Sequence, residues 1–164
     1  MCAVSIRQTV DHNWAEMFAL VLDVERYPQF VPGCTHEHIY SRRDISPGRT
    51  EIISRMTVGV PPIQSGYTNR TVGDRDAHRI TVDSTDGPLR TLHVTWQFEP
   101  CGPTRTLIEF SADYEFRSAI VARIATRAFE SLFRKIVDAF ERQARLRRSQ
   151  LSRPPILALA PQRL

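Results

Sequence analysis

The sequence predicts one α+β domain in which a curved antiparallel sheet of about seven strands wraps around a long C-terminal helix, with two short helices after the first strand. Two observations carry this prediction. Short alternating segments separated by turn residues follow one another between residues 34 and 116, which is typical of an antiparallel meander. A helical pattern then continues from Ala119 to Arg147. The length of 164 residues fits a single domain with a substantial core.

The N-terminal segment predicts a strand and then a helical region. Apolar and polar residues alternate over residues 4–10, which is the period of a half-buried strand. Apolar residues then recur at helical spacing from Trp14 to Val24. Asp11 or Asn13 can cap this helix, and we favour Asp11 for its short acceptor side chain. The proline-bounded segment that follows has room for one helical turn around residues 29–31.

Six further strands are predicted, at residues 36–42, 50–60, 63–72, 78–84, 90–98 and 107–116. The strongest turn between them is Asp-Gly-Pro at residues 86–88. The strand at 90–98 has the clearest pattern, because its apolar side chains, including Trp96 and Phe98, fall on one face and polar ones on the other. An apolar inner face of the sheet follows from this alternation.

The long helix carries more apolar surface than one flat sheet can cover. Its apolar residues span an arc of about 220° or more at about 100° per residue, and Ser118 is placed to cap its start. A curved sheet that grips the helix, or a ligand or membrane beside it, accounts for the surplus. This order of elements predicts a helix-grip fold with an apolar cavity between sheet and helix. We assign residues 1–148 to the domain and the proline-containing residues 149–164 to a flexible tail.

Composition and motifs exclude several classes of protein. Apolar residues make up 41% of the chain, but no run of about 18 apolar residues predicts a membrane span. No signal peptide is recognisable, and three cysteines without a C-x-x-C pair argue against a disulfide framework. We therefore expect a cytoplasmic protein. Hydrolase, metalloprotease and nucleotide-binding motifs are absent, so no catalytic residue is predicted.

The histidines do not predict a metal site. His36 and His38 share a strand face, but no third ligand has matching spacing. His12, His78 and His93 are expected at the surface. We expect neither a metal nor a covalent cofactor.

Three sequence motifs stand out. They are DVERYPQFVPGC at residues 23–34, DGPLR with WQFEP at residues 86–90 and 96–100, and FRS with AFERQA at residues 116–118 and 139–144. Together they resemble the coenzyme-Q-binding, polyketide-cyclase-like family of START-like helix-grip proteins. The family also includes bacterial proteins named ribosome-association toxins, and the birch-pollen allergen shares its fold. Gly33 stands where the family has a tryptophan.

The resemblance implies a carrier of ubiquinone or a related isoprenoid quinone or lipid, which supports respiratory electron transport or quinone synthesis. The toxin branch implies instead binding to ribosomal RNA or a ribosomal subunit. Cyclases and aromatases share the fold, so an enzyme is a third hypothesis, although fold alone does not decide function.

Candidate ligand-binding residues follow from the inner faces. Apolar side chains form the expected walls, a polar pair on one strand could bond a quinone carbonyl, and aromatic residues of the proline-bounded segment could form a lid or a membrane-touching edge. The walls are Met56, Val58, Trp96, Phe98, Phe110, Phe116, Phe129 and Phe133, the polar pair is Tyr67 and Asn69, and the lid residues are Tyr27 and Phe30. Core packing is the alternative for each wall residue.

The C-terminal region is basic. Residues 117–153 include ten basic and three acidic residues, so this segment carries a net charge of +7 within a chain of net charge +4. Arg123, Arg127, Arg134 and Arg145 fall on one polar arc of the long helix. They can contact lipid phosphates on the inner face of the cytoplasmic membrane. Alternatively, they can contact the phosphates of RNA. A solvated helix face is the alternative. The oligomeric state is not predicted.

Overall fold

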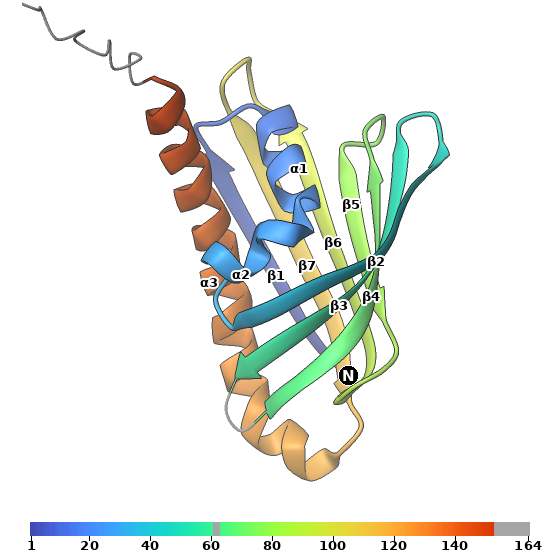
Figure 1. The fold of residues 1–164 in the computed structure, drawn as a ribbon. Helices are drawn as coiled ribbons and strands as arrows, with labels where there is room; N and C mark the ends of the chain where they lie inside the picture. Colours follow the sequence, from blue (N-terminus) through green and yellow to red (C-terminus); the bar gives the residue numbers. More distant parts are fainter. Residues whose placement is uncertain (61–62, 153–164) are drawn as a thin grey trace, which may run out of the picture.

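The protein folds as a seven-stranded antiparallel sheet wrapped around one long helix (Figure 1). The structure is a computed structural model and describes residues 1–60 and 63–152. The helices are α1 (Trp14–Leu22), the 3-10 turn η1 (Val24–Arg26), α2 (Tyr27–Phe30) and α3 (Ala119–Leu151). The strands are β1 (Cys2–Val10), β2 (Cys34–Ser46), β3 (Arg49–Val60), β4 (Ile63–Asp74), β5 (Arg79–Ser84), β6 (Leu89–Pro100) and β7 (Thr106–Phe116). The predicted fold class is confirmed.

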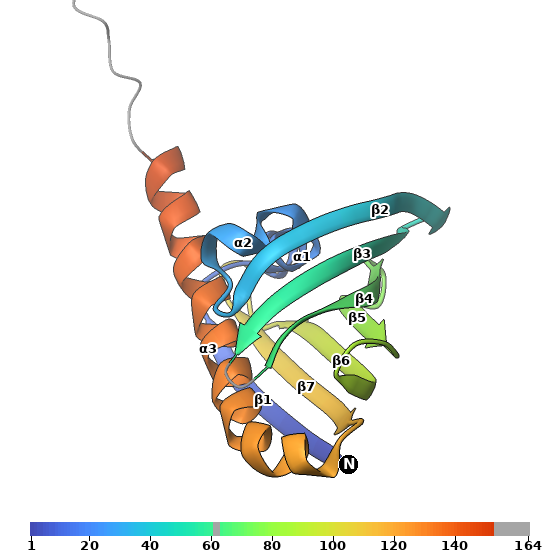
Figure 2. The ribbon, with the colours of Figure 1, turned by 60° about the horizontal axis from the view of Figure 1, so that its bottom comes forward.

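The sheet has the strand order β1-β7-β6-β5-β4-β3-β2. Strands β2 to β7 form a meander, and β1 joins it by pairing with β7. The sheet curves so that its concave face turns toward α3, while η1 and α2 lie between β2 and α3 (Figure 2). The concave face of the sheet, the α2 segment and α3 therefore surround the interior of the protein.

Alternation in the sequence accounts for the inner face of the sheet. Trp96 and Phe98 on β6 are buried, as are Phe110 and Phe116 on β7, whereas Thr91 on the opposite face is exposed. Burial of apolar area stabilises a fold by about 25 cal/mol per Å², so these side chains favour packing of the sheet against the helix. The predicted faces of both strands are confirmed.

Helix α3 packs on this face through one apolar stripe. Its buried residues include Ala125, Phe129, Phe133 and Val137, at spacings of four residues. The Ser118 hydroxyl accepts a hydrogen bond from the Val121 amide at 3.3 Å and caps the helix as predicted. The helix continues through Leu151, so the tail does not begin at residue 149. The remainder of the expected tail, residues 153–164, lies outside the described residues.

Three local predictions are corrected. Asn13 caps α1 by accepting from the Glu16 amide at 2.8 Å, because α1 begins at Trp14 and Asp11 lies too far ahead of it. The second helical turn occupies Tyr27–Phe30, slightly earlier than expected. His12 is buried at 1% exposure, because its segment turns inward and its carbonyl oxygen accepts from the Thr106 hydroxyl at 2.7 Å.

The Asp-Gly-Pro turn joins distant parts of the chain. Gly87 has a φ of +68°, and a Cβ there would lie 2.8 Å from the Gly66 carbonyl oxygen, so glycine is required. The Arg117 guanidinium donates to the Gly87 carbonyl oxygen at 3.0 Å. Two of the motifs that carry the family resemblance thus meet at the start of α3.

Candidate ligand-binding cavity

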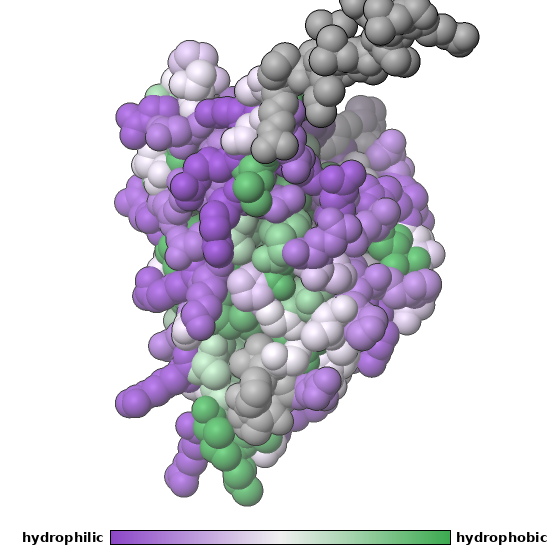
Figure 3. All heavy atoms as spheres, turned by 60° about the vertical axis from the view of Figure 1, so that its left-hand side comes forward, coloured by the Kyte–Doolittle hydropathy of each residue, from purple (hydrophilic) through white to green (hydrophobic). Residues whose placement is uncertain are grey.

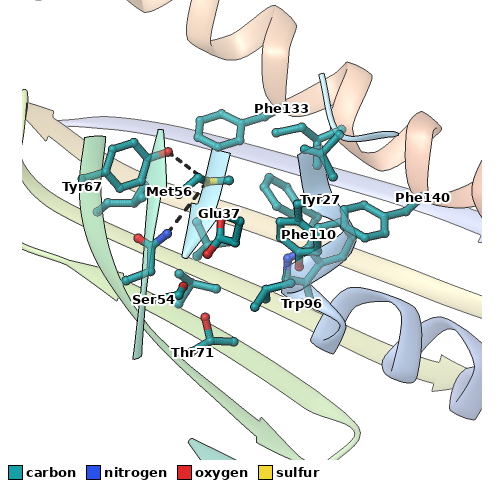
Figure 4. Close-up of a pocket in the computed structure, with 17 residues that line it drawn as sticks. Tyr27, Glu37, Ser54, Met56, Tyr67, Thr71, Trp96, Phe110, Phe133 and Phe140 are labelled. Atoms are coloured by element: carbon teal, nitrogen blue, oxygen red, sulfur yellow. Dashed lines mark hydrogen bonds between the residues drawn. The ribbon is translucent and has the colours of Figure 1, made fainter. Parts of the chain in front are cut away.

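A cavity opens between the concave face of the sheet, the η1–α2 segment and α3 (Figure 4). Its lining is largely apolar and aromatic, with polar groups contributed by β2, β3 and β4. The lining residues are Val24, Tyr27, Val31, Glu37, Ser54, Met56, Tyr67, Asn69, Thr71, Val82, Leu92, Val94, Trp96, Phe110, Phe133, Ile136 and Phe140.

The size of the cavity limits what it can enclose. It holds about 630 Å³ of space outside atoms, including its open mouth, and about 90 Å³ of this admits the centre of a water molecule. One water needs roughly 10–15 Å³ by that measure, so about six to nine waters fit inside, whereas a cavity that holds benzene has about 150 Å³, so a substituted ring also occupies part of the open mouth. A long isoprenoid chain has to extend through the mouth.

Seven of the twelve predicted ligand-binding residues line this cavity. They are Tyr27, Met56, Tyr67, Asn69, Trp96, Phe110 and Phe133. Trp96 and Phe110 lie edge to face with ring centroids 4.8 Å apart. Phe133 of α3 reaches the same place from the opposite wall, with its ring centroid 5.6 Å from that of Phe110. The structure brings these residues together, and their role in binding stays a prediction.

The other five predicted residues lie outside the cavity lining. Phe116 and Phe129 pack against each other with ring centroids 5.1 Å apart. Phe98 packs against Phe18 of α1 with ring centroids 6.0 Å apart. Val58 is a buried core residue, and Phe30 is half-buried against Phe140. Their positions share one reason: alternation assigns a residue to the inner face, but that face is longer than the cavity, and a binding role for these five stays a prediction.

Sequence reasoning missed ten lining residues, of which Glu37 is the most consequential. Strand β2 pairs with β3 through irregularities at Cys34/His36 and Ile39/Ser41. The register is regular from His36 to Ile39, but neither face of the predicted strand at residues 36–42 is clearly apolar, so alternation did not show that Glu37 points into the cavity. Ser54 of β3 and Thr71 of β4 also line the cavity and were not among the predicted residues.

The polar groups form one connected wall across three neighbouring strands. In the strand register Glu37 lies opposite Met56, and Met56 opposite Tyr67. In the adjacent row Ser54 lies opposite Asn69. Directly opposed residues have Cβ atoms about 4.5–5.5 Å apart. We call Glu37, Ser54, Met56, Tyr67 and Asn69 the polar wall (Figure 4).

Hydrogen bonding within the polar wall is incomplete. The Tyr67 hydroxyl and the Asn69 amide nitrogen both donate to the Met56 sulfur, at 3.7 and 3.9 Å. A thioether is a weak acceptor. Among the described residues, Glu37 Oε2, Ser54 Oγ and Asn69 Oδ1 are buried without any hydrogen-bond partner. Buried polar groups are normally paired, so these atoms are available to a bound molecule or water.

Glu37 titrates near neutral pH. Burial raises the pKa of its carboxyl to about 7, and the nearby Ser54 hydroxyl opposes this rise. No hydrogen bond of normal geometry joins the two side chains, since both Glu37 Oε2 and Ser54 Oγ lack a partner. A carboxyl with this pKa can be an acceptor or a donor in the cavity within the physiological range.

The η1–α2 segment closes one side of the cavity. The Tyr27 hydroxyl donates to the Val21 carbonyl oxygen. Its ring packs against Phe140 of α3 with centroids 5.4 Å apart. Burial, with Glu37 as a secondary cause, raises the pKa of Tyr27 well above its usual value. Tyr27 thus sits as a fixed, neutral side chain between α3 and the cavity.

The four arginines proposed for membrane or RNA contact are all exposed on α3. At about 100° per residue, Arg123, Arg127, Arg134 and Arg145 fall within about 40° of one another. Next to them near the start of the helix, Ile120 and Ile124 are 74% and 60% exposed. Figure 3 shows this side of the molecule, with hydrophobic surface at its lower end where α3 begins.

Residues 1–60 and 63–152 contain neither a metal-binding cluster nor a disulfide. No cluster of three or more His, Cys, Asp or Glu side chains there could hold a metal ion. Cys2, Cys34 and Cys101 are free thiols. None of the helices in that part of the chain is both long and apolar enough to cross a membrane.

The sequence and structure match known proteins. The model of the family described as polyketide cyclase / dehydrase and lipid transport matches residues 10–141. The chain is 30% identical to the ribosome association toxin RatA of Escherichia coli strain K12 over 145 residues, which is 88% of each chain. It is 29% identical over 133 residues to the mitochondrial coenzyme Q-binding protein COQ10 homolog B of Xenopus laevis, covering 79% of this chain and 52% of that protein.

A solved structure supports the fold. The START superfamily protein from Mycobacterium smegmatis superposes with a TM-score of 0.75 over 88% of this chain and 97% of that chain, at 18% identity. At this identity the likeness shows the fold alone. The START-like resemblance found from the sequence motifs is confirmed.

Proposed function

We propose that this chain, which belongs to the polyketide cyclase / dehydrase and lipid transport family, binds a small apolar molecule with a ring-sized headgroup in the cavity. Ubiquinone or a related isoprenoid quinone is the ligand class that we favour. The observation that carries the proposal is the cavity itself, whose aromatic walls meet a polar wall at one side. This combination suits a flat ring with oxygen substituents.

The energetics require the tail as well as the ring. A ring that buries about 150–250 Å² gains about 4–6 kcal/mol at about 25 cal/mol per Å². The loss of translational and rotational freedom on association costs at least about 4 kcal/mol. A headgroup ring without its tail is therefore expected to bind weakly. Each buried methylene adds about 0.8 kcal/mol. Affinity is therefore expected to rise with the first carbons of the tail that pack against the apolar lining of the cavity.

Calorimetric titration with a short-tailed ubiquinone tests this proposal. Ile136→Trp fills the cavity from α3 without burying a charge and is expected to lower affinity at least about tenfold. Ile124→Trp is the matched control, because it lies on the exposed side of the same helix. Equal affinity in both folded variants, or no uptake by the unmodified protein, contradicts the proposal.

The start of α3 supports a peripheral contact with anionic membranes, where a carrier collects such a ligand. Exposed Ile120 and Ile124 lie beside Arg123 and Arg127, a combination that suits an amphipathic helix at a lipid surface. The double variant Ile120→Ser/Ile124→Ser is expected to lose flotation with anionic vesicles. Leu146→Ser, at 57% exposure on the same helix, is the control. Unchanged flotation of the double variant contradicts this contact.

Ribosome binding is the second candidate, favoured by the similarity to RatA over 88% of the chain. The arginine arc supplies positive charge for phosphates. Glu130, Asp138 and Glu141 lie on the same side of the helix and reduce that charge. Co-sedimentation with ribosomal subunits that weakens with salt, and fails in Arg127→Glu/Arg134→Glu, would favour this candidate over the carrier.

A cyclase or dehydratase is the remaining alternative. It requires a titratable group in the cavity, and Glu37 is such a group. The family description includes this chemistry. Recovery of a bound polyketide-like ligand in altered form would favour an enzyme, whereas release of the ligand unchanged favours a carrier.

A further inference from the structure

We propose that the polar wall selects a headgroup bearing a ring hydroxyl, such as a hydroquinone or another phenol, over one whose oxygens only accept hydrogen bonds. This inference rests on the proposed function and specifies that a ligand of the quinone class binds in its reduced, hydroxyl-bearing form in preference to the oxidised quinone. Its basis is the set of three buried polar atoms without partners, one from each of β2, β3 and β4. Ser54 and Asn69 are 1% and 7% exposed, and both side chains line the cavity.

The free atoms lie within reach of one headgroup. Ser54 and Asn69 face each other across β3 and β4, and Glu37 is in the next row, opposite Met56. Directly opposed side chains are about 5 Å apart at Cβ. One ring oxygen placed over Met56 can therefore meet groups from all three strands.

The balance of donors and acceptors decides which headgroup fits. Asn69 turns its amide nitrogen to the Met56 sulfur, which leaves its Oδ1 free as an acceptor. Glu37 Oε2 is a second free acceptor when the carboxyl is ionised. A ring hydroxyl donates to either of them and accepts from Ser54 or Tyr67. A carbonyl or ether oxygen can only accept, so it leaves both acceptors unpaired.

Glu37 makes this preference depend on pH. The titratable groups that face it are Tyr27 from α2, Cys34 from its own strand and Tyr67 from β4. Burial raises the pKa of the Cys34 thiol to about 12 and raises the pKa of both tyrosines, so these groups stay neutral near pH 7. The α3 residues at the cavity are apolar. Burial raises the pKa of Glu37 to about 7, so its charge changes between pH 6 and pH 8.

A matched pair of probes isolates the hydroxyl. An alkylphenol and its methyl ether differ by one donor, and neither ionises between pH 6 and pH 8. A ligand that displaces water must replace the hydrogen bonds of that water. Leaving a buried acceptor unpaired lowers affinity roughly tenfold. We expect the phenol to bind at least about tenfold more tightly than the ether at pH 8, with a smaller ratio at pH 6.

Calorimetric titration of both probes into the full chain tests the inference. Glu37→Gln is expected to remove the pH dependence and to reduce the preference, while Glu99→Gln, an exposed carboxylate on β6, leaves both unchanged. Ser54→Ala adds a second test and is expected to weaken phenol binding a few-fold. Equal affinities for phenol and ether, or an unchanged pH profile in Glu37→Gln, overturn this inference alone. No binding of either probe overturns it together with the proposed function.

Discussion

The substitution Glu37→Gln should stabilise the protein at pH 8 and have little effect at pH 5. The change keeps the shape of the side chain and removes its charge. Glu37 is half-buried against the cavity, and burial raises the pKa of its carboxyl from 4.5 to about 7. The folded protein therefore holds a proton on Glu37 that the unfolded chain releases between these two values.

The magnitude follows from linkage. Because the folded state binds more protons, the free energy of unfolding falls as the pH rises from about 4.5 to about 7 and stays lowered above that range. At about 1.4 kcal/mol per pH unit between the two pKa values, the full loss is about 3.5 kcal/mol. Solvent at the half-exposed side chain reduces this to about 1.5 kcal/mol. Glutamine avoids the loss because it does not ionise.

Urea denaturation of both proteins at pH 5 and pH 8 measures this effect. The difference between variant and unmodified protein cancels the titration of all other groups. We expect the gain to be about 1.5 kcal/mol larger at pH 8 than at pH 5. The same difference at both pH values would refute the burial of an ionisable carboxyl in the cavity. Glu99→Gln is the control and should show no pH-dependent gain.

Three further changes test the packing around the cavity. Phe140→Ala should lower the free energy of unfolding by about 3–5 kcal/mol, because the ring is 1% exposed and contacts α2 and the sheet. Tyr40→Ala, at an exposed position, is the control and should change the free energy of unfolding by less than about 0.5 kcal/mol. Gly87→Ala should cost about 1–3 kcal/mol more than Gly48→Ala, since φ is +68° and +75° at these positions but only at Gly87 would the added Cβ lie 2.8 Å from a carbonyl oxygen; equal losses of melting temperature would contradict the steric argument. Phe133→Arg places a charge in the cavity and should abolish ligand binding in calorimetry; a folded variant that still binds would contradict the location of the site.

The sheet and the long helix were predictable because they depend on periodicity. Alternation along residues 90–98 and 107–116 fixed the inner faces of β6 and β7, and the wide apolar arc of α3 indicated a curved partner. Local capping was harder to predict. Asp11 and Asn13 have similar capping ability, and the exact first residue of α1 decided between them.

The cavity was only partly predictable. Trp96, Phe110 and Phe133 reach it, whereas Phe116 and Phe129 lie on the same faces and fill the core. Periodicity gives the direction of a side chain but not its depth along the sheet. Glu37 escaped prediction for a different reason, because neither face of residues 36–42 is clearly apolar and alternation there did not indicate the inner face.

The central claim is that the cavity holds an apolar ligand with a polar ring. The most direct measurement is mass spectrometry of an organic extract from the unmodified protein, purified under native conditions, beside an extract from Ile136→Trp. The account predicts a near-stoichiometric compound with an oxygenated ring and an apolar chain in the first extract, and its loss from the second. Empty extracts from both, with no uptake after quinone is added, would contradict the account and favour ribosome binding.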